Sequence, residues 1–313
     1  MSASILVLGA GSIGRRHAQN LLELGADVTL SDPDAERAAS VPGVRPARPP
    51  LDDIPPVDAI VVASPTSLHA EHAGWALERV AAVLVEKPLV ATEQEAVPLR
   101  QHLDRIMVGY NLRLVEGVRQ FVELVHTGRI GPARSLRLWF GSWLPAWRPA
   151  VDYRTTYSAQ RALGGGVLLD AIHELDLLVW LAGDGEFEVV GALVDRVGPL
   201  ELDCEDTVKA VLRHRSGTPA EISLDYLARR YRRGIEVIGA EATACLDWTT
   251  GTIELSTAEE TERAEVSMDP AAAYREEAAR FLAFAAGTAP APVGGAEGLA
   301  SVVLADRIRA AAR

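Results

Sequence analysis

A glycine pattern near the amino terminus constrains the fold of this chain more than any other part of the sequence. The pattern, GAGSIG at residues 9–14, lies between an apolar run and a segment of helical period. In that context Gly9 permits a tight turn, Gly11 lets the backbone approach a pyrophosphate, and Gly14 lets the helix pack close to the sheet. The N–H groups at the start of the helix favour phosphate. The pattern therefore predicts a dinucleotide-binding unit, whose expected cofactor contacts are Gly9, Gly11, Ser12, Ile13 and Gly14.

An acidic residue, Asp32, directly follows the second apolar run at residues 26–31. At this position a carboxylate can accept a hydrogen bond from the ribose 2′-hydroxyl and repel a 2′-phosphate. We therefore predict NAD as the cofactor in preference to NADP. Two other interpretations stay open at this point: the glycines and Asp32 could form only a local turn and a helix cap, and Arg37 could turn toward a 2′-phosphate.

The hydrophobic pattern changes near residue 113. Before it, short runs rich in Val, Ile and Leu alternate with segments of helical period, which is typical of a parallel α/β sheet. The strands expected there are residues 4–8, 26–31, 58–63, 81–85 and 106–110, and the helices are residues 13–24, 33–40, 68–80 and 93–104.

After residue 113, longer alternating runs favour a mainly antiparallel sheet. These runs are residues 135–143, 188–197, 207–213, 221–227 and 235–246, and the helices expected beside them are residues 168–181, 274–286 and 298–309. The length of the chain also favours two domains over one core. We expect a doubly wound Rossmann sheet in residues 1–113, followed by an α+β domain in residues 114–313.

Composition excludes several classes of protein. A formal net charge of -12 would repel a phosphate backbone, so nucleic acid is not an expected partner. Cys204 and Cys245 have neither CxxC spacing nor a His/Cys cluster nearby, which argues against a disulfide or structural zinc and favours a reducing compartment. The start lacks a basic leader, and no stretch approaches the roughly 20 apolar residues of a membrane span. We expect a soluble, cytoplasmic protein with no membrane partner.

Polar motifs follow three of the strands expected in the parallel sheet. Ligands of open α/β sheets bind outside the carboxyl ends of the strands, so residues just past each strand are candidates for the site. The motifs are Ser64-Pro65-Thr66-Ser67-Leu68-His69, Glu86-Lys87-Pro88 and Gly109-Tyr110-Asn111-Leu112-Arg113. The expected cofactor contacts among them are Ser64, Pro65, Thr66, His69, Glu86 and Lys87, and Arg113 is an expected substrate contact.

Together with the sequence GGGVLLDAIHELD at residues 164–176, these motifs resemble the Gfo/Idh/MocA family of oxidoreductases. The resemblance runs from the glycine turn to at least residue 181. It implies a Rossmann domain and an open-faced, mainly antiparallel α+β domain, with substrate held between that sheet and the nicotinamide. It also implies that Lys87, Asp170 and His173 line the reaction centre.

One spacing departs from the family pattern. Two residues separate Asp170 from His173, whereas family members similar to inositol dehydrogenase usually have three at this point. The interval from His173 to Asp176 is unchanged. His173 is therefore the firmer of the two assignments.

The chemistry of these side chains supports the same assignment. Oxidation of an alcohol carbon requires a base for the hydroxyl proton, and histidine has an ordinary pKa near neutrality, so His173 is the expected base. Lys87 can donate to the substrate oxygen and stabilise negative charge as it develops. Asp170 lies on the same helical face as His173 and could orient the imidazole or anchor a sugar hydroxyl. Ordinary polar roles for His173, beside Asp170 or Asp176, and for Lys87, beside Glu86, stay open.

The segment from residue 143 to 157 is rich in aromatic and basic side chains. Such groups often hold a polar ligand, so it is a candidate substrate-binding loop, although its rings could equally pack on their own domain. Its expected substrate contacts are Arg148, Tyr153, Arg154 and Tyr157. The basic run at residues 229–233 could grip a phosphate or carboxylate, but a solvated strand end or a subunit contact is favoured. His69 and His72 share a helical face without further ligands, so no metal is predicted.

The sequence as a whole predicts an NAD(H)-dependent oxidoreductase. We expect hydride transfer between the nicotinamide and a secondary alcohol or ketone of a sugar, amino sugar, cyclitol or sugar nucleotide, with His173 as acid/base and Lys87 polarising the oxygen. Two alternatives stay open: a redox-neutral enzyme that uses bound NAD for epimerisation, elimination or hydrolysis, and a non-catalytic NAD sensor. A homo-oligomer, either a dimer or a tetramer, is also expected.

Overall fold

The computed structural model describes residues 2–49 and 54–312, and the chain divides into two compact units. Unit 1 consists of Met1–Asn111 and Pro270–Leu299, and unit 2 consists of Leu112–Asp269 and Ala300–Arg313. The expected boundary after residue 113 thus lies close to the observed change at Asn111. The sequence did not predict that Pro270–Leu299 returns to unit 1.

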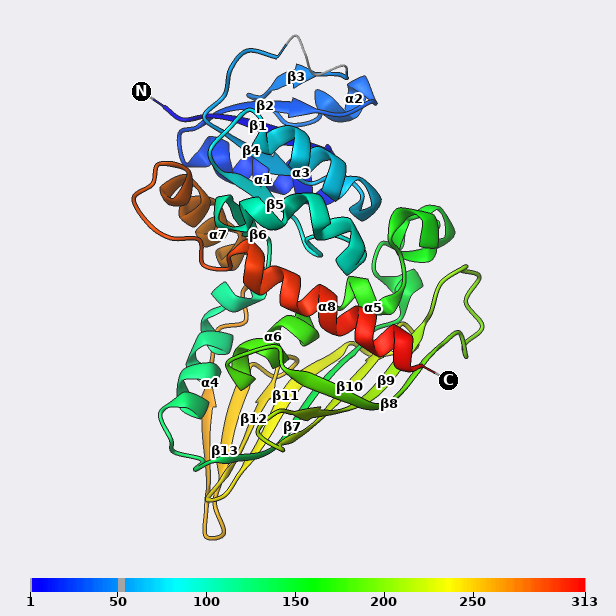
Figure 1. The fold of residues 1–313 in the computed structure, drawn as a ribbon, viewed down its shortest axis with the longest axis vertical. Coiled ribbons are helices and arrows are strands. Elements are labelled where there is room, and N and C mark those ends of the chain that lie inside the picture. Colours follow the sequence, from blue (N-terminus) through cyan, green and yellow to red (C-terminus); the bar gives the residue numbers. More distant parts are fainter. Residues whose placement is uncertain (1, 50–53, 313) are drawn as a thin grey trace. The chain divides into compact units, whose positions relative to one another are not determined.

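Unit 1 is built on a six-stranded parallel sheet with the strand order β3-β2-β1-β4-β5-β6 (Figure 1). Its strands are β1 (Ser4–Leu8), β2 (Asp27–Ser31), β3 (Arg45–Ala47), β4 (Ala59–Val62), β5 (Val83–Val85) and β6 (Ile106–Val108). The order reverses at β1, which pairs with β2 on one side and β4 on the other. That reversal is the point of a doubly wound sheet at which ligands bind.

The secondary structure of unit 1 differs from the prediction in one helix and in one short strand. Its regular helices are α1 (Ser12–Glu23), α2 (Ala35–Ala38), α3 (His69–Leu77) and α7 (Pro270–Ala285). The segment Glu93–Arg105 is helical as expected but is a 3-10 helix, with Pro98 inside it. Proline has no N–H and its ring clashes with the preceding turn, so a regular α-helix is disfavoured there. The short strand β3 within the proline-rich connection was not predicted.

The core of unit 1 explains why α7 belongs to it. Apolar side chains of β1 and β2 form one buried cluster with α1 and with Ala278 and Phe281 of α7. Phe281 is completely buried, and burying a side chain of that size stabilises the fold by about 1.5–3 kcal/mol. Helix α7 is therefore a structural part of the Rossmann unit, although it follows more than 150 residues of unit 2.

Unit 2 is built on an eight-stranded sheet with the order β14-β13-β12-β11-β7-β10-β9-β8. All of its pairs are antiparallel except β7 with β10. The strands are β7 (Ala133–Gly141), β8 (Phe187–Asp195), β9 (Thr207–His214), β10 (Pro219–Asp225), β11 (Arg232–Gly239), β12 (Thr243–Asp247), β13 (Thr252–Ser256) and β14 (Thr261–Glu265). The expected fold class, a Rossmann sheet followed by a mainly antiparallel α+β domain, is confirmed.

One face of this second sheet is covered by helices. These helices are α4 (Glu116–His126), α5 (Val167–Asp170) and α6 (His173–Ala182). A further helix, α8 (Gly295–Ala311), begins in unit 1 and ends in unit 2. In β9, Val208, Ala210 and Leu212 are buried, whereas Lys209 and Val211 between them are exposed. This alternation places one set of side chains in the core and the other on the open face.

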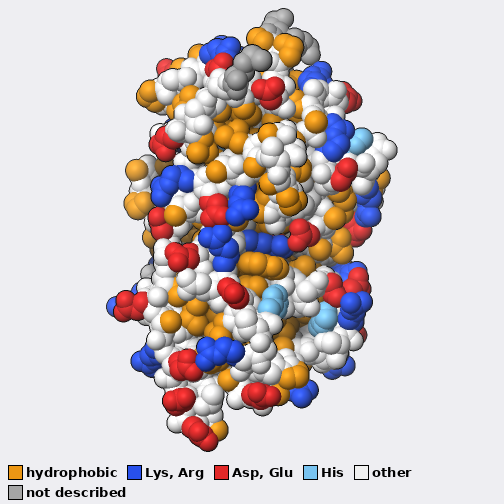
Figure 2. Space-filling model, turned by 90° about the vertical axis from the view of Figure 1, so that its left-hand side faces the viewer, with side chains coloured by type: hydrophobic (Ala, Val, Ile, Leu, Met, Phe, Trp, Pro, Cys, Tyr) orange, Lys and Arg blue, Asp and Glu red, His pale blue; other side chains and the backbone are white. Residues whose placement is uncertain are grey.

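The surface carries both kinds of charge. On the face drawn in Figure 2, acidic and basic side chains are interspersed, and apolar side chains are exposed between them. None of the helices in the described ranges is both long enough and apolar enough to cross a membrane.

Candidate active site

The glycine turn forms a cradle with room for a ligand. Gly9 has φ +99°, and a Cβ atom there would lie 2.5 Å from the Ala63 carbonyl oxygen. A Cβ at Gly14 would lie 1.8 Å from the Gly9 carbonyl oxygen, so the close approach of helix α1 to the turn requires glycine. A Cβ at Gly11 would meet nothing within 4 Å. Gly11 therefore borders open space at the start of α1, as a site for pyrophosphate requires.

Asp32 is held beside this turn. Its carboxylate accepts the Ala10 N–H at 2.8 Å and the Asp34 N–H at 2.9 Å, one on each oxygen. Each carboxylate oxygen has two lone pairs, so both can still accept a ribose hydroxyl. The side chain is almost fully buried, and its position at the end of β2 fits NAD. The open space at Gly11 and the fixed carboxylate of Asp32 are the features that binding of a dinucleotide requires here.

His69 links the loops that follow β4 and β5. Its Nδ1 lies 2.7 Å from the Pro88 carbonyl oxygen and its Nε2 lies 2.9 Å from the Ser64 carbonyl oxygen. Burial lowers the pKa of His69, so the neutral ring donates to only one of these two carbonyls at a time. Thr66 is buried in the same loop, and His72 Nδ1 lies 2.9 Å from Ser64 Oγ. In the structure the His69 ring connects the two loops through these hydrogen bonds. Its contact with the cofactor stays a prediction.

The motif after β5 fixes the backbone of Lys87. Glu86 is buried, its Oε2 accepts the Lys87 backbone N–H at 3.1 Å, and its Oε1 lies 2.6 Å from Nε2 of His17. Burial alone would raise the pKa of Glu86, but the hydrogen bond and charge of His17, followed by the charge of Lys87, hold it below its ordinary value. Glu86 is therefore an ionised carboxylate that accepts two hydrogen bonds.

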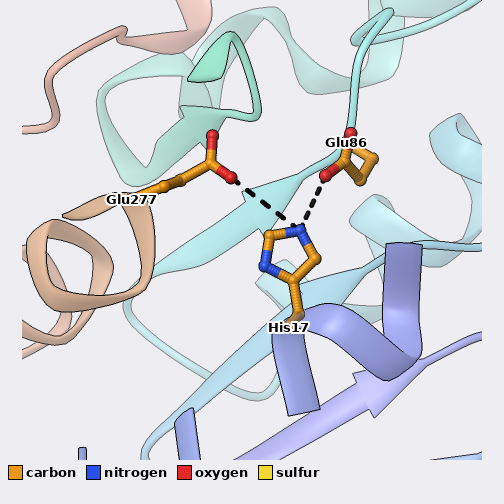
Figure 3. Close-up of side chains that lie close together, drawn as sticks. All are labelled: His17, Glu86 and Glu277. Carbon is orange, nitrogen blue, oxygen red and sulfur yellow. Dashed lines mark hydrogen bonds and ion pairs between the residues drawn. The ribbon is translucent and has the colours of Figure 1, made fainter. Parts of the chain in front are cut away.

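Two residues of this region were not predicted from the sequence. His17 of α1 and Glu277 of α7 lie next to Glu86 in the core of unit 1 (Figure 3). His17 follows Gly14 by three residues on the buried face of α1, which is a detectable signal, whereas nothing local marks Glu277. A further unused signal concerns Lys87: the chain has only two lysines, Lys87 and Lys209, among 31 lysines and arginines. The lysine ammonium is a compact cation on a flexible stem and differs in chemistry from the arginine guanidinium. A lysine at a strand end, in a chain that otherwise uses almost only arginine, is therefore a signal of function.

In unit 2, Asp170 and His173 lie at adjoining helix ends. Asp170 is the last residue of α5, His173 is the first of α6, and both are buried. Asp170 accepts hydrogen bonds from the hydroxyls of Tyr157 and Tyr226, the latter at 2.6 Å. Burial, and then the charge of Asp170, raise the pKa of both tyrosines well above the ordinary value, so both phenols stay protonated donors. Tyr226 was not predicted, because it lies at the end of β10 and far from the helix in sequence.

Arg113 and Asp176 form a buried ion pair in the same unit. The guanidinium Nε lies 2.9 Å from Oδ2 and Nη2 lies 2.7 Å from Oδ1, and the side chains are 5 % and 1 % exposed. The planar guanidinium thus matches the carboxylate at two points. The pair gives Arg113 a structural role, and its contact with substrate stays a prediction.

The aromatic segment packs largely within unit 2. The Trp147 indole N–H donates to Ser142 Oγ at 2.8 Å, and its ring meets the edge of the Tyr226 ring at 5.4 Å between centroids. Tyr153 accepts the Glu201 backbone N–H. Arg148 and Arg154 are both exposed, and Arg154 pairs with Asp152 and Glu201. Among the predicted substrate contacts in this segment, Tyr157 donates a hydrogen bond to a predicted reaction-centre residue, Asp170.

The basic run also finds partners within unit 2. Arg233 pairs with the buried Glu174, with 2.5 Å between Nε and Oε1. Arg232 pairs with Asp225 at 2.5 Å, and the Arg229 guanidinium lies 3.6 Å from the centre of the Trp143 ring. Glu174 directly follows His173, so this pair helps to fix the start of α6. The favoured view, a solvated strand end or a subunit contact, holds in part: the run leads into β11, but Arg233 is not solvated. The subunit contact stays a prediction.

The glycine cradle, Asp32 and the motif after β5 together define an NAD-dependent oxidoreductase with a Rossmann domain. The family model described as "Oxidoreductase family, NAD-binding Rossmann fold" matches residues 3–109, and the model of the GFO/IDH/MocA C-terminal domain matches residues 118–245. The chain belongs to the Gfo/Idh/MocA family. The expected family, the enzyme class and NAD as cofactor are thereby confirmed.

Named relatives agree with this class. The chain is 30% identical over 274 residues to myo-inositol 2-dehydrogenase of Thermotoga maritima, covering 82% of this chain and 79% of that protein. It is 28% identical over 253 residues to UDP-N-acetylglucosamine 3-dehydrogenase of Acidithiobacillus ferrooxidans, covering 80% and 75%. The structure of levoglucosan dehydrogenase in complex with NADH and levoglucosan shares the fold, with a TM-score of 0.85 at 21% identity and coverage of 100% and 97%.

Proposed function

We propose that this protein is an NAD(H)-dependent dehydrogenase or reductase that acts on a secondary alcohol or ketone of a sugar-like substrate. The observation that carries the proposal is the position of Lys87. It lies two residues past the end of β5, at the carboxyl end of the NAD-binding sheet, where ligands of such sheets bind. The relatives act on myo-inositol, UDP-N-acetylglucosamine and levoglucosan, which are all rich in hydroxyl groups.

The proposed reaction assigns one task to each of two side chains. Bound NAD would supply the acceptor for a hydride from the carbinol carbon of the substrate. His173 takes the proton of the substrate hydroxyl as the carbonyl forms, and returns it in the reverse direction. The Lys87 ammonium stabilises the negative charge that develops on the same oxygen. One hydride and one proton thus leave the alcohol, which becomes the ketone.

Asp170 supports this assignment as part of the substrate site. Its carboxylate is held by the hydroxyls of Tyr157 and Tyr226, so its position is fixed before any ligand binds. A buried carboxylate beside two phenols suits a ligand with several hydroxyl groups, which can both donate and accept hydrogen bonds. We therefore place Asp170 in substrate orientation, next to His173 as the acid/base.

A substrate panel tests the proposal. The purified protein is mixed with NAD and with myo-inositol, levoglucosan or UDP-N-acetylglucosamine, and NADH absorbance is followed. A lasting rise is expected with at least one hydroxyl-rich compound of this kind. Redox-neutral conversion of substrate would favour epimerisation, elimination or hydrolysis with bound NAD, and NAD binding with no reaction across a wide panel would favour a sensor.

Two variants then test the residue assignments. His173→Asn and Lys87→Met should each lower kcat on the order of 10²-fold, while the Kd for NAD stays within about threefold. Lys209→Met is the matched control for lysine, because Lys209 lies on β9 and binds Ser223 Oγ. Near-normal turnover by both variants would show that the assignments are wrong.

The proposal includes a homo-oligomer in a reducing, cytoplasmic compartment. Both cysteines are free thiols, which fits such a compartment. Large apolar side chains are exposed on strands of unit 2, and contact with a second copy would bury them. They are Val190, Leu193, Val211 and Ile238. Light scattering after gel filtration should give the mass of a dimer or tetramer, and a monomer would contradict this element of the proposal.

A further inference from the structure

Three titratable side chains meet in the core of unit 1, outside the residues that the proposed reaction uses. His17 comes from α1, Glu86 follows β5, and Glu277 comes from α7 (Figure 3). They are 1 %, 7 % and 1 % exposed. Charged groups are almost never buried to this extent without a specific arrangement of partners. In this cluster, one of the three side chains also binds the backbone of Lys87.

Glu86 connects His17 with the backbone of Lys87. One carboxylate oxygen lies 2.6 Å from His17 Nε2, and the other accepts the Lys87 N–H at 3.1 Å. Because an ionised carboxylate only accepts hydrogen bonds, Nε2 must carry the proton in the first contact. Gly109 packs against the same carboxylate, since a Cβ there would lie 3.0 Å from its Cδ. The carboxylate is thus held by a ring nitrogen, a peptide N–H and a neighbouring backbone.

Glu277 is the second acid beside the same imidazole. Its Oε2 lies 4.0 Å from His17 Nε2, too far for a hydrogen bond. Neither of its carboxyl oxygens has a hydrogen-bond partner among the described residues. Burial, and then the charge of Glu86, raise the pKa of Glu277 well above its ordinary value. A neutral Glu277 does not compete with Glu86 for the His17 proton, so the short contact with Glu86 is kept.

We propose that His17 is a positioning residue for the reaction, because by holding Glu86 it fixes the peptide that carries Lys87. The inference rests on the proposed role of Lys87 at the substrate oxygen. His17 itself touches neither substrate nor the reacting atoms in this scheme. Its effect is geometric: a displacement of about 1 Å in a catalytic group can cost on the order of 10²-fold in rate.

The first test compares two replacements of His17. Leu removes the donor to Glu86, whereas the amide nitrogen of Gln can reach the place of Nε2 and donate there. His17→Leu should lower kcat about tenfold or more with KM and the Kd for NAD within about threefold, and His17→Gln should restore most of the rate. Asn20→Leu is the control, because it also replaces a buried polar residue of α1 by leucine. Equal rates for the Leu and Gln variants would overturn the inference.

A third variant covers the case in which His17→Leu does not fold. Gly109→Ala leaves His17 and Glu86 in place but pushes a methyl group against the Glu86 carboxylate. It should lower kcat in the same selective way, with the Kd for NAD nearly unchanged. Unchanged turnover in a folded Gly109→Ala protein would overturn the inference independently of the His17 variants.

A double-variant experiment separates this inference from the proposed function. If His17 acts through Lys87, His17→Leu should cause no further loss of kcat in a Lys87→Met background. Full turnover of Lys87→Met alone would refute the proposed function. A slow Lys87→Met enzyme in which His17→Leu still lowers kcat by its usual factor would overturn only the positioning role.

Elemental analysis provides the last test. The three ligand-type atoms lie within 4.8 Å of one another, and a cation between His17 and Glu86 would have to push apart a nitrogen and an oxygen that now lie 2.6 Å from each other. The purified protein should therefore contain well under one equivalent of zinc or other divalent metal. A stoichiometric metal that is lost in His17→Gln would overturn the inference.

Discussion

Replacement of Glu277 by glutamine should change how stability depends on pH. In the folded protein the Glu277 carboxyl is buried without a hydrogen-bond partner among the described residues, and its pKa is raised well above the ordinary 4.5. In the unfolded chain the same group ionises near 4.5. Between these two pKa values the folded state binds one proton more than the unfolded state. The wild-type protein must therefore lose stability as pH rises through this window.

The size of the effect follows from the one proton involved. A difference of one bound proton changes the free energy of unfolding by about 1.4 kcal/mol per pH unit at 25 °C. Glutamine has nearly the same shape and does not titrate. The stability of Glu277→Gln relative to wild type should thus increase by about 1.4 kcal/mol for each pH unit above 4.5, and should level off at the folded pKa.

Equilibrium urea unfolding at pH 5, 6, 7 and 8, followed by far-UV circular dichroism, measures this difference. Glu276→Gln is the matched control, since Glu276 lies on the same helix and pairs with Arg280 near the surface. Its difference from wild type should stay within about 0.5 kcal/mol. Free energies for Glu277→Gln and wild type that run parallel from pH 5 to pH 8 would refute a neutral Glu277 in the folded protein.

Three further predictions concern the cofactor site and the ion pair of unit 2. Asp176→Asn leaves the buried Arg113 charge without its carboxylate, so urea unfolding should show a loss of about 3–5 kcal/mol, and a loss below about 1 kcal/mol would contradict a tight buried pair. Gly11→Ala should fold normally but bind NAD more weakly in calorimetry, whereas Gly14→Ala should unfold at lower temperature because its Cβ would overlap a carbonyl oxygen. Asp32→Ser should raise the kcat/KM ratio of NADP to NAD on the order of tenfold or more, and an unchanged ratio would remove Asp32 from cofactor selection.

Local patterns were sufficient to predict the frame of the protein. The turn at Gly9, the acid at Asp32 and the alternating apolar runs each depend on residues that are neighbours in sequence, and the fold class is confirmed. Where the local pattern was ambiguous, the observed secondary structure differs from the predicted one. Pro98 makes Glu93–Arg105 a 3-10 helix, and the proline-rich connection forms the short strand β3 (Arg45–Ala47). Neither of these two segments contains a residue of the candidate site.

Partners of candidate residues could not be predicted from spacing. Arg113, which follows a strand of the Rossmann sheet and is predicted to contact substrate, forms a buried ion pair with Asp176, one turn beyond the candidate base His173. Asp170 was expected to orient the imidazole or bind substrate, and Tyr226, which follows the distant strand β10, supplies one of its hydrogen bonds. Only tertiary contacts decide such pairings, because a charged side chain in the core binds the nearest group that compensates it.

Glu86 and Glu277 show why the rest of the site needed the structure. In the sequence Glu86 belongs to a recognisable motif, whereas Glu277 lies in an expected helix near the carboxyl terminus, and nothing indicates that the two meet. In the fold they lie beside one imidazole, and a hydrogen bond to His17 keeps Glu86 ionised while burial beside that charge keeps Glu277 neutral. Two like charges this close in the core would repel strongly, so only one acid can be ionised. The acid that ionises is Glu86, which accepts the Lys87 N–H. The charge distribution among these buried groups therefore helps to fix the backbone of the residue that is proposed to act on substrate.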